Sequence, residues 1–106
     1  MYRLECLPIL KRDMEEIMDY RSRVAGDPPA AEALCIHLLK ASESLKKFPY
    51  IGIRLAAEFP LQKEYRILLV RKYLLFFTID EERKMVTLVR LIYGWKKYDK
   101  LLKLVE

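Results

Sequence analysis

The spacing of apolar residues predicts a short strand followed by two helices in the first half of the chain. Residues 2–7 alternate as a short strand does. Apolar residues then recur at helical spacing over residues 10–24 and again over residues 31–45, with charged residues on the opposite faces. Between them, Gly26 suits the left-handed turn after a helix and Asp27 suits the N-cap of the next one. This pattern is typical of a helical hairpin.

The second half of the chain changes to short runs rich in aromatic and β-branched residues. Residues 47–62 contain two prolines and a glycine and are predicted to form a loop. Residues 64–71, 72–80 and 85–93 then fit three strands joined by tight connections, as in antiparallel hairpins. The order strand, helix, helix, strand, strand, strand predicts an α+β fold, with one antiparallel sheet packed on the helical hairpin in a single domain over residues 1–106.

These three strands are apolar on both faces, which is unusual for a sheet with one solvated side. We expect the helices to cover the parity that comprises Tyr65, Ile67, Leu69, Tyr73, Leu75, Phe77, Val89 and Leu91. The other parity comprises Arg66, Leu68, Val70, Leu74, Phe76, Thr78, Leu88 and Arg90. Two interpretations are open for this second face: it receives a partner, or the C-terminal segment of the chain folds over it.

Composition narrows the class of protein. Hydrophobic residues make up 53% of the chain and charged residues 33%, which is typical of a globular domain. No apolar run approaches the roughly 20 residues that span a bilayer, and the N-terminus lacks the features of a signal peptide, so we expect a soluble cytoplasmic protein. Cys6 and Cys35 are expected to be buried free thiols. His37 has no partners at metal-ligand spacing, so no metal site and no cofactor are predicted.

Positive charge is concentrated towards the C-terminus. Residues 62–106 contain 11 Lys and Arg against 6 Asp and Glu, whereas residues 1–61 contain nine of each, so the second half carries the whole net charge of +5. This asymmetry indicates a basic surface for a polyanion or an acidic partner. Within it, Trp95, Lys96, Lys97 and Tyr98 form either a contact surface or part of a short terminal helix that caps the sheet.

The chain resembles the RelE/ParE toxins of bacterial type II toxin–antitoxin systems. The resemblance rests on the stretches MYRLECLP, DMEEIMDY, LKKFPYIG, EYRILLVRKYLLFFTID and VRLIYGWKKYDKLL, in that order. It implies a small toxin that arrests growth and that a co-expressed antitoxin, encoded next to it, holds inactive. Members of the family act by one of two routes: some cleave mRNA in the ribosomal A site, and others poison DNA gyrase without catalysis.

Two departures from the ribonuclease pattern favour the second route. Leu74 follows Tyr73 where ribonuclease members often have an arginine. The segment Tyr93–Tyr98 reads YGWKKY where many members have His-Gly-Arg-Arg before an acidic residue and a tyrosine. We therefore favour a ParE-like gyrase poison. A RelE-like ribosome-dependent endoribonuclease and a degenerate member that only binds its antitoxin stay open as alternatives, so the sequence leaves open whether the protein is an enzyme.

Each route makes its own assignment of residues. If the protein is a ribonuclease, its catalytic residues are Tyr98, Lys96, Lys97 and Arg90. The residues expected to contact the target, gyrase or the ribosome with its mRNA, are Arg66, Arg71, Lys72, Trp95, Lys96 and Lys97. An amphipathic or extended antitoxin segment, acidic because this half of the chain is basic, is expected to bind either the groove beside the helical hairpin or the apolar face formed by Leu68, Phe76, Leu88 and Arg90.

Overall fold

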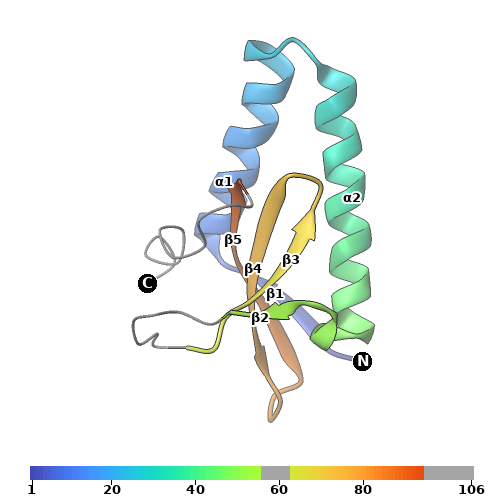
Figure 1. Ribbon diagram of the computed structural model, residues 1–106, viewed down its shortest axis with the longest axis vertical. Coiled ribbons are helices and arrows are strands. Elements are labelled where there is room, and N and C mark those ends of the chain that lie inside the picture. The colour runs from blue at the N-terminus through green and yellow to red at the C-terminus, as the bar shows by residue number, and fades with distance from the viewer. Residues whose placement is uncertain (56–62, 95–106) are drawn as a thin grey trace.

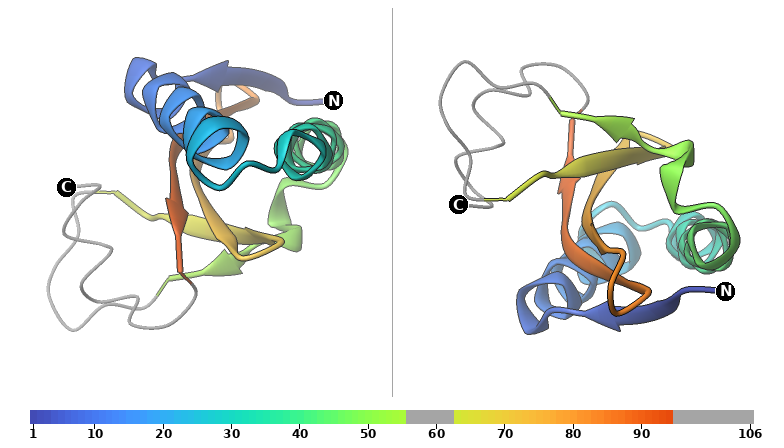
Figure 2. Two further views of the ribbon diagram at one scale, coloured as in Figure 1. Left: turned by 90° about the horizontal axis from the view of Figure 1, so that it is seen from above. Right: turned by 90° about the horizontal axis from the view of Figure 1, so that it is seen from below.

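A helical hairpin lies against one side of a twisted β-sheet in the computed structural model, which describes residues 1–55 and 63–94 (Figures 1 and 2). The elements are, in order, β1 (Arg3–Cys6), α1 (Pro8–Asp19), η1 (Tyr20–Val24), α2 (Pro28–Lys47), η2 (Pro49–Ile51), β2 (Ile53–Arg54), β3 (Arg66–Val70), β4 (Tyr73–Asp80) and β5 (Met85–Tyr93). This order confirms the predicted α+β architecture. None of these helices is long and apolar enough to cross a membrane.

The connection between the helices forms as its residue types predict. The last turn of the first helix widens into the π-helical η1, in which the N–H of Ala25 donates to the carbonyl of Tyr20 at 2.8 Å. Gly26 has a φ of +65° and reverses the chain. Asp27 then caps α2, because its carboxylate accepts a hydrogen bond from the N–H of Ala30 at 3.2 Å.

The sheet differs from the prediction in two respects within the described residues. Its order is β1-β5-β4-β3-β2, and β1 pairs parallel to β5, so the sheet is mixed rather than wholly antiparallel. A parallel pair needs a long connection, and here it comprises the helical hairpin together with β2, β3 and β4. The second difference is β2, which forms where a loop was predicted. Gly52 permits it, because a Cβ there would lie 2.5 Å from Cζ of Phe77.

The predicted assignment of β3 to the two faces is wrong. The two-residue turn at Arg71 and Lys72 pairs Val70 with Tyr73, so even-numbered residues of β3 lie beside odd-numbered residues of β4. Leu68 consequently faces the helices, and it packs against their core. The turn length, rather than the apolar pattern, decides the face.

A β-bulge changes the parity again in β5. Phe76 pairs with Arg90 while Phe77 pairs with Leu88, which leaves Val89 as the extra residue. Leu88 and Leu91 therefore both lie in the helix-facing core, although they have opposite parity in the sequence. Val89, which was expected under the helices, belongs to the cluster on the other face.

The sheet has a buried cluster on each face. The helix-facing cluster comprises Leu10, Leu34, Leu38, Leu45, Val70, Tyr73, Leu75, Phe77, Val86, Leu88 and Leu91. The opposite cluster comprises Tyr65, Ile67, Leu74, Phe76 and Val89, with Leu7, Leu55 and Ile92 packed against it. Phe76 is 0% exposed. Phe76 itself is therefore not exposed to a partner, and the alternative that the C-terminal segment folds over this face lies outside the described residues.

Candidate functional site

Three cationic side chains line a cleft where the tip of the helical hairpin meets the β3–β4 turn and the end of β5. This basic cleft has a volume of about 700 Å³. Its lining residues are Arg21, Ala30, Ala33, Leu34, Arg71, Lys72, Tyr73 and Tyr93. No carboxylate is among these described lining residues. The cleft therefore combines positive charge with two tyrosines.

The turn between β3 and β4 presents two of these cations. Arg71 has a φ of +58°, so the chain reverses within Arg71 and Lys72. The end of β5 is tied to the same turn, because the N–H of Gly94 donates to the carbonyl of Lys72 at 3.0 Å. Both basic side chains are exposed. A tight turn thus holds two adjacent positive charges at the edge of the cleft.

Arg21 reaches the cleft from η1 and meets Tyr73. Its Nε donates a hydrogen bond to the Tyr73 hydroxyl at 3.1 Å, and its guanidinium lies 5.6 Å from the centroid of that ring. The ring of Tyr93 meets the ring of Tyr73 edge to face, with centroids 5.3 Å apart. The hydrogen bond to Tyr73 raises the pKa of Arg21. Arg21 is therefore a fixed positive charge.

Partners without negative charge hold both arginines of the basic cleft in place. Nη2 of Arg71 contacts Nε2 of His37. A guanidinium only donates, so Nε2 of His37 is the acceptor in this contact. None of the ion pairs in the described residues includes Arg21, Arg71 or Lys72. The charges of Arg21 and Arg71 are therefore positioned by partners other than carboxylates.

A second cleft, of about 480 Å³, adjoins the first and is more aromatic. This tyrosine cleft is lined by Glu16, Ile17, Tyr20, Arg21, Ala25, Tyr73 and Tyr93. It shares Arg21, Tyr73 and Tyr93 with the basic cleft. Tyr20 is 59% exposed and Tyr93 is 61% exposed, so both present ring surface to a ligand. Cations beside exposed aromatic rings can hold a phosphate and stack on a base.

Arg90, an expected catalytic and antitoxin-binding residue, is engaged by α1. Its guanidinium forms two hydrogen bonds with the Asp13 carboxylate, at 2.7 and 2.9 Å. Asp13 also accepts from the N–H of Leu91 at 3.1 Å. The bond to Asp13 raises the pKa of Arg90. Among the described residues, Asp13 is the one charged residue that is buried. Its pair with Arg90 joins α1 to β5.

Arg66 is likewise engaged, away from the basic cleft. Its Nη2 donates to the carbonyl of Gly52 at 2.7 Å, and its guanidinium lies 5.2 Å from the centroid of the Tyr50 ring. Of the residues expected to contact the target, the structure therefore brings together Arg71 and Lys72 and leaves Arg66 apart. The remaining predicted residues, Trp95, Lys96, Lys97 and Tyr98, lie outside the described residues.

The four residues expected to bind an antitoxin do not share one surface. Leu68 and Leu88 pack on the helix side, Phe76 is buried on the opposite side, and Arg90 pairs with Asp13. The other location considered for an antitoxin was the groove beside the helical hairpin. An apolar cleft of about 170 Å³ lies there, between the helices and the sheet. This interhelical groove is lined by Cys6, Leu10, Met14, Cys35, Leu38, Leu39, Ser42, Leu75, Leu88 and Leu91.

The cysteines depart from the expectation of two buried thiols. Both are free, but Cys6 is exposed and Cys35 is half-buried. Cys6 is the last residue of β1, a strand paired on one side only, which explains its exposure. Both residues line the interhelical groove.

Sequence reasoning missed Arg21, Tyr20 and His37. In the sequence these residues occupy turns of two amphipathic helices and carry no motif. The π-helical turn η1 places Arg21 over Tyr73, and no residue pattern in the sequence indicates this turn. Such turns are frequent at functional sites. The exposed tyrosines follow the helix and strand periodicity without marking a site.

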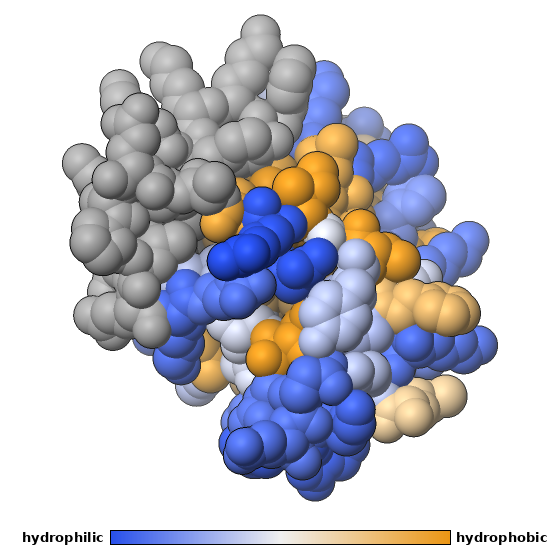
Figure 3. All heavy atoms as spheres, turned by 60° about the horizontal axis from the view of Figure 1, so that its bottom comes forward, coloured by the Kyte–Doolittle hydropathy of each residue, from blue (hydrophilic) through white to orange (hydrophobic). Residues whose placement is uncertain are grey.

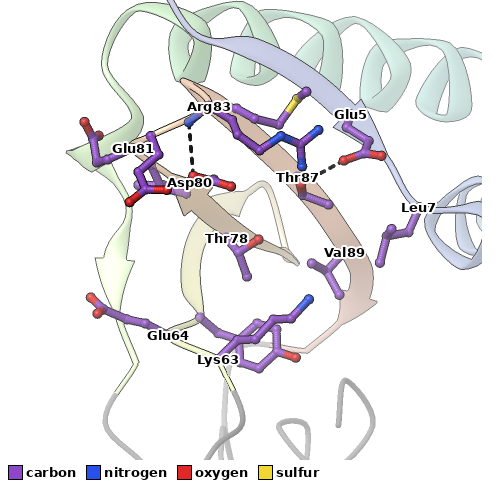
Figure 4. A pocket seen from close by; sticks show the side chains of 14 residues that line it. Glu5, Leu7, Lys63, Glu64, Thr78, Asp80, Glu81, Arg83, Thr87 and Val89 are labelled. Atoms are coloured by element: carbon purple, nitrogen blue, oxygen red, sulfur yellow. Dashed lines mark hydrogen bonds between the residues drawn. The ribbon is translucent and has the colours of Figure 1, made fainter.

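A larger cleft, of about 760 Å³, has the opposite charge and lies by the β4–β5 turn (Figure 4). Its described lining includes five acidic residues, Glu5, Glu64, Asp80, Glu81 and Glu82, against Lys63 and Arg83. This end of the molecule is mainly hydrophilic, with small apolar areas between the charged residues (Figure 3). Despite these acids, the described residues contain no group of three or more His, Cys, Asp or Glu that could hold a metal ion.

Glu81 keeps its charge at this acidic end. It accepts hydrogen bonds from Nζ of Lys84 at 2.8 Å and from the hydroxyls of Tyr2 and Tyr50. These bonds, the one from Lys84 first, lower the pKa of Glu81 to about 2. The acidic lining of this cleft contrasts with the basic cleft, whose described lining has no carboxylate.

Comparisons with known structures place the fold. A chain of the structure described as the chromosomal ParDE TA system from P. aeruginosa superposes with a TM-score of 0.69 at 18% identity, covering 90% of this chain and 98% of that one. The Mycobacterium tuberculosis RelBE2 toxin–antitoxin complex contains a chain with a TM-score of 0.60 at 20% identity, covering 87% and 96%. A metal-bound toxin from Helicobacter pylori gives 0.58 at 18% identity, covering 88% and 94%. No curated protein sequence matches.

The sequence itself identifies the family. Residues 6–98 match the family described as ParE toxin of type II toxin-antitoxin system, parDE. The match spans both helices and the strands β3, β4 and β5. The chain therefore belongs to the ParE toxins of type II toxin–antitoxin systems.

Proposed function

We propose that this toxin arrests growth by poisoning DNA gyrase without catalysis. The bidentate pair between Arg90 and Asp13 carries the proposal. RNA cleavage requires a base, charge stabilisation on the phosphate and an acid for the leaving oxygen. Arg90 is the one predicted catalytic residue within the described part of the chain, and its guanidinium is directed to a carboxylate rather than to a substrate.

The surroundings of β4 support the same function. Leu74, at the position where ribonuclease members often have an arginine, is 1% exposed and packs in an apolar cluster. It supplies no charge to a scissile phosphate. The exposed cations of the basic cleft, Arg71 and Lys72, are then a contact surface for the target. A contact surface requires no acid–base pair.

A RelE-like ribonuclease is the second candidate. The basic cleft favours it, because cations beside exposed tyrosines suit RNA as well as a protein target. On this route Lys96, Lys97 and Tyr98 supply the catalysis. The third candidate is a degenerate member that binds its antitoxin and has no toxicity, and the same experiments distinguish it.

Induced expression separates the candidates. Gyrase poisoning should change plasmid supercoiling and accumulate gyrase-cleaved DNA before protein synthesis falls. Ribosome-dependent cleavage should stop protein synthesis first and produce cut mRNA. Growth without either effect would identify a degenerate member. The purified toxin, incubated with gyrase and plasmid, should increase cleaved DNA, and unchanged cleavage would contradict the proposal.

A pair of matched double variants tests the contact surface. Asn tolerates a positive φ, so Arg71→Asn with Lys72→Ala removes two charges without disturbing the turn. The control, Lys47→Ala with Arg83→Ala, removes two exposed charges from the other end of the molecule. The first double variant should lose most of its gyrase-dependent toxicity and the control should keep it. Equal toxicity would show that the basic cleft does not contact the target.

We also propose that the interhelical groove receives an apolar anchor of the antitoxin, as part of an acidic amphipathic segment. The groove is lined almost wholly by apolar side chains, and Leu39 at its margin is 64% exposed. Leu39→Glu should therefore weaken antitoxin binding. Ser44→Glu, also exposed on α2, is the control because it introduces the same charge elsewhere. Association should slow as salt rises, since the net charge of the toxin is +5.

A further inference from the structure

We propose that the basic cleft and the tyrosine cleft together bind a single strand of nucleic acid. The proposed function assigns the basic cleft to a contact with gyrase, and this inference adds a nucleic-acid ligand to that same surface; it rests on the proposed function to this extent. The phosphate lies between Arg21 and the turn residues Arg71 and Lys72. A neighbouring base lies on the exposed rings of the tyrosine cleft.

The charge of the basic cleft suits a phosphate. A typical surface arginine is paired with an acid, as Arg23 is with Asp19 in the adjacent turn, and its charge is then largely cancelled. Arg21 and Arg71 instead have a tyrosine hydroxyl and an imidazole nitrogen as partners, neither of which carries a negative charge. Their guanidiniums are held in position and keep their charge, so they lose little side-chain entropy when an anion binds.

The aromatic residues select a strand with accessible bases. Tyr20 and Tyr93 are more than half exposed and lie on the lining of one cleft with Arg21. Bases stack on such rings in single-strand sites, whereas the bases of a duplex are stacked on each other and unavailable. Glu16 also lines this cleft, which disfavours a phosphate there and tolerates a base, whose edge carries N–H donors. Phosphate and base thus have separate places.

The two clefts form one path across three elements. Arg21, Tyr73 and Tyr93 line both, so a ligand that leaves the β3–β4 turn passes them before it reaches α1. The acidic cleft lies by the other end of β4, where it repels the same ligand. The charge distribution therefore favours one orientation of the strand's approach.

Binding of the full-length toxin to a fluorescein-labelled 12-nucleotide DNA strand, followed by anisotropy, tests the proposal. Identical RNA and the matching DNA duplex are the comparison ligands, and an acidic peptide of equal charge is the competitor. Arg71→Asn with Lys72→Ala should weaken strand binding at least about tenfold and reduce the salt slope by roughly one to two. Lys47→Ala with Arg83→Ala should weaken it less than about twofold.

The tyrosine variant isolates the stacking contact. Tyr20→Ala should reduce affinity for the single strand several-fold, with the salt slope and the duplex affinity unchanged. Thermal unfolding of each variant confirms that it is folded. Tighter binding of the RNA strand than of the DNA strand would identify RNA as the ligand and would still support a single-strand site. Equal losses in both double variants, tighter binding of the acidic peptide, or full affinity in Tyr20→Ala would each overturn the proposal.

The outcomes for the two proposals are separable. A toxin that poisons gyrase but does not bind the oligonucleotide contradicts this inference and leaves the proposed function standing. A toxin that binds the strand through the two clefts, yet leaves gyrase unaffected, supports the inference and contradicts the proposed function.

Discussion

The Nε of Arg21 donates a hydrogen bond to the hydroxyl of Tyr73 at 3.1 Å, and so joins the tip of the helical hairpin to the start of β4. Tyr73→Phe removes that hydroxyl and keeps the ring and its packing. We expect a loss of roughly 1 kcal/mol in the free energy of unfolding, since one hydrogen bond is lost and Arg21 regains water. Toxicity should fall as Arg21 loses its fixed position.

Urea unfolding and growth arrest after induction measure these two effects. Tyr20→Phe is the matched control, because Tyr20 is exposed and makes no hydrogen bond through its hydroxyl within the described residues. It should change neither quantity. Equal behaviour of the two variants would show that the bond between Arg21 and Tyr73 has no functional part.

The pair between Asp13 and Arg90 should dominate the stability of the junction between α1 and β5. The side chains of Arg90 and Asp13 are 19% and 9% exposed. Removing one partner leaves the other charge poorly solvated, so Asp13→Asn should cost about 3 kcal/mol in unfolding free energy. Asp19→Asn breaks the exposed pair with Arg23 and should cost less than about 0.5 kcal/mol. Similar costs for the two variants, measured by urea titration, would contradict this assignment.

Glu81 makes stability depend on pH at the acidic end. Its folded-state pKa of about 2 lies below the ordinary value of 4.5. The contribution is therefore fully present above the unfolded pKa, and it is lost as pH falls from about 4.5 towards 2. Glu81→Gln should lower the urea midpoint at pH 7, and the difference from the parent should shrink across that window. Glu82→Gln, at an exposed position without a described partner, should show no such trend.

Removal of the Tyr98 hydroxyl distinguishes a nuclease from a gyrase poison. Tyr98 lies outside the described residues, so this prediction rests on the sequence and the proposed function. General acid–base groups contribute typically about 10²–10⁴-fold to a rate. Tyr98→Phe should keep appreciable toxicity if the surface only makes contacts. Abolished mRNA cleavage in this variant, with clear cleavage by the parent, would establish the ribonuclease alternative.

The elements were predictable because each depends on neighbours in the sequence. Helical spacing, Gly26 and Asp27 specify the hairpin locally, and the aromatic runs specify the strands. The faces were not predictable, because one inserted residue at Val89 and an even-length turn at Arg71 and Lys72 each reverse the parity of a strand. Neither the bulge nor the turn changes the apolar pattern from which the faces were inferred.

The candidate site was predictable only in part. Arg71 and Lys72 could be chosen because they are basic residues between two strands. Arg21 and Tyr73 are 52 positions apart, and Asp13 and Arg90 are 77 apart, so their contacts arise from the packing of the hairpin on the sheet. The resemblance points to Arg90 as a catalytic residue, but nothing in the sequence near Arg90 indicates its partner Asp13 on α1.

The carboxylate of Asp13 also bears on how the edge of β5 is protected from pairing with another chain. β1 pairs with β5 only from Met85 to Leu88, so no strand of the described residues neighbours the later part of β5 on that side. A free strand edge is a template for pairing with another chain and for aggregation. Asp13 occupies that edge by accepting the Leu91 N–H, and β2 at the other end of the sheet is only two residues long. Asp13 therefore leaves less unpaired backbone on β5 for another chain to pair with.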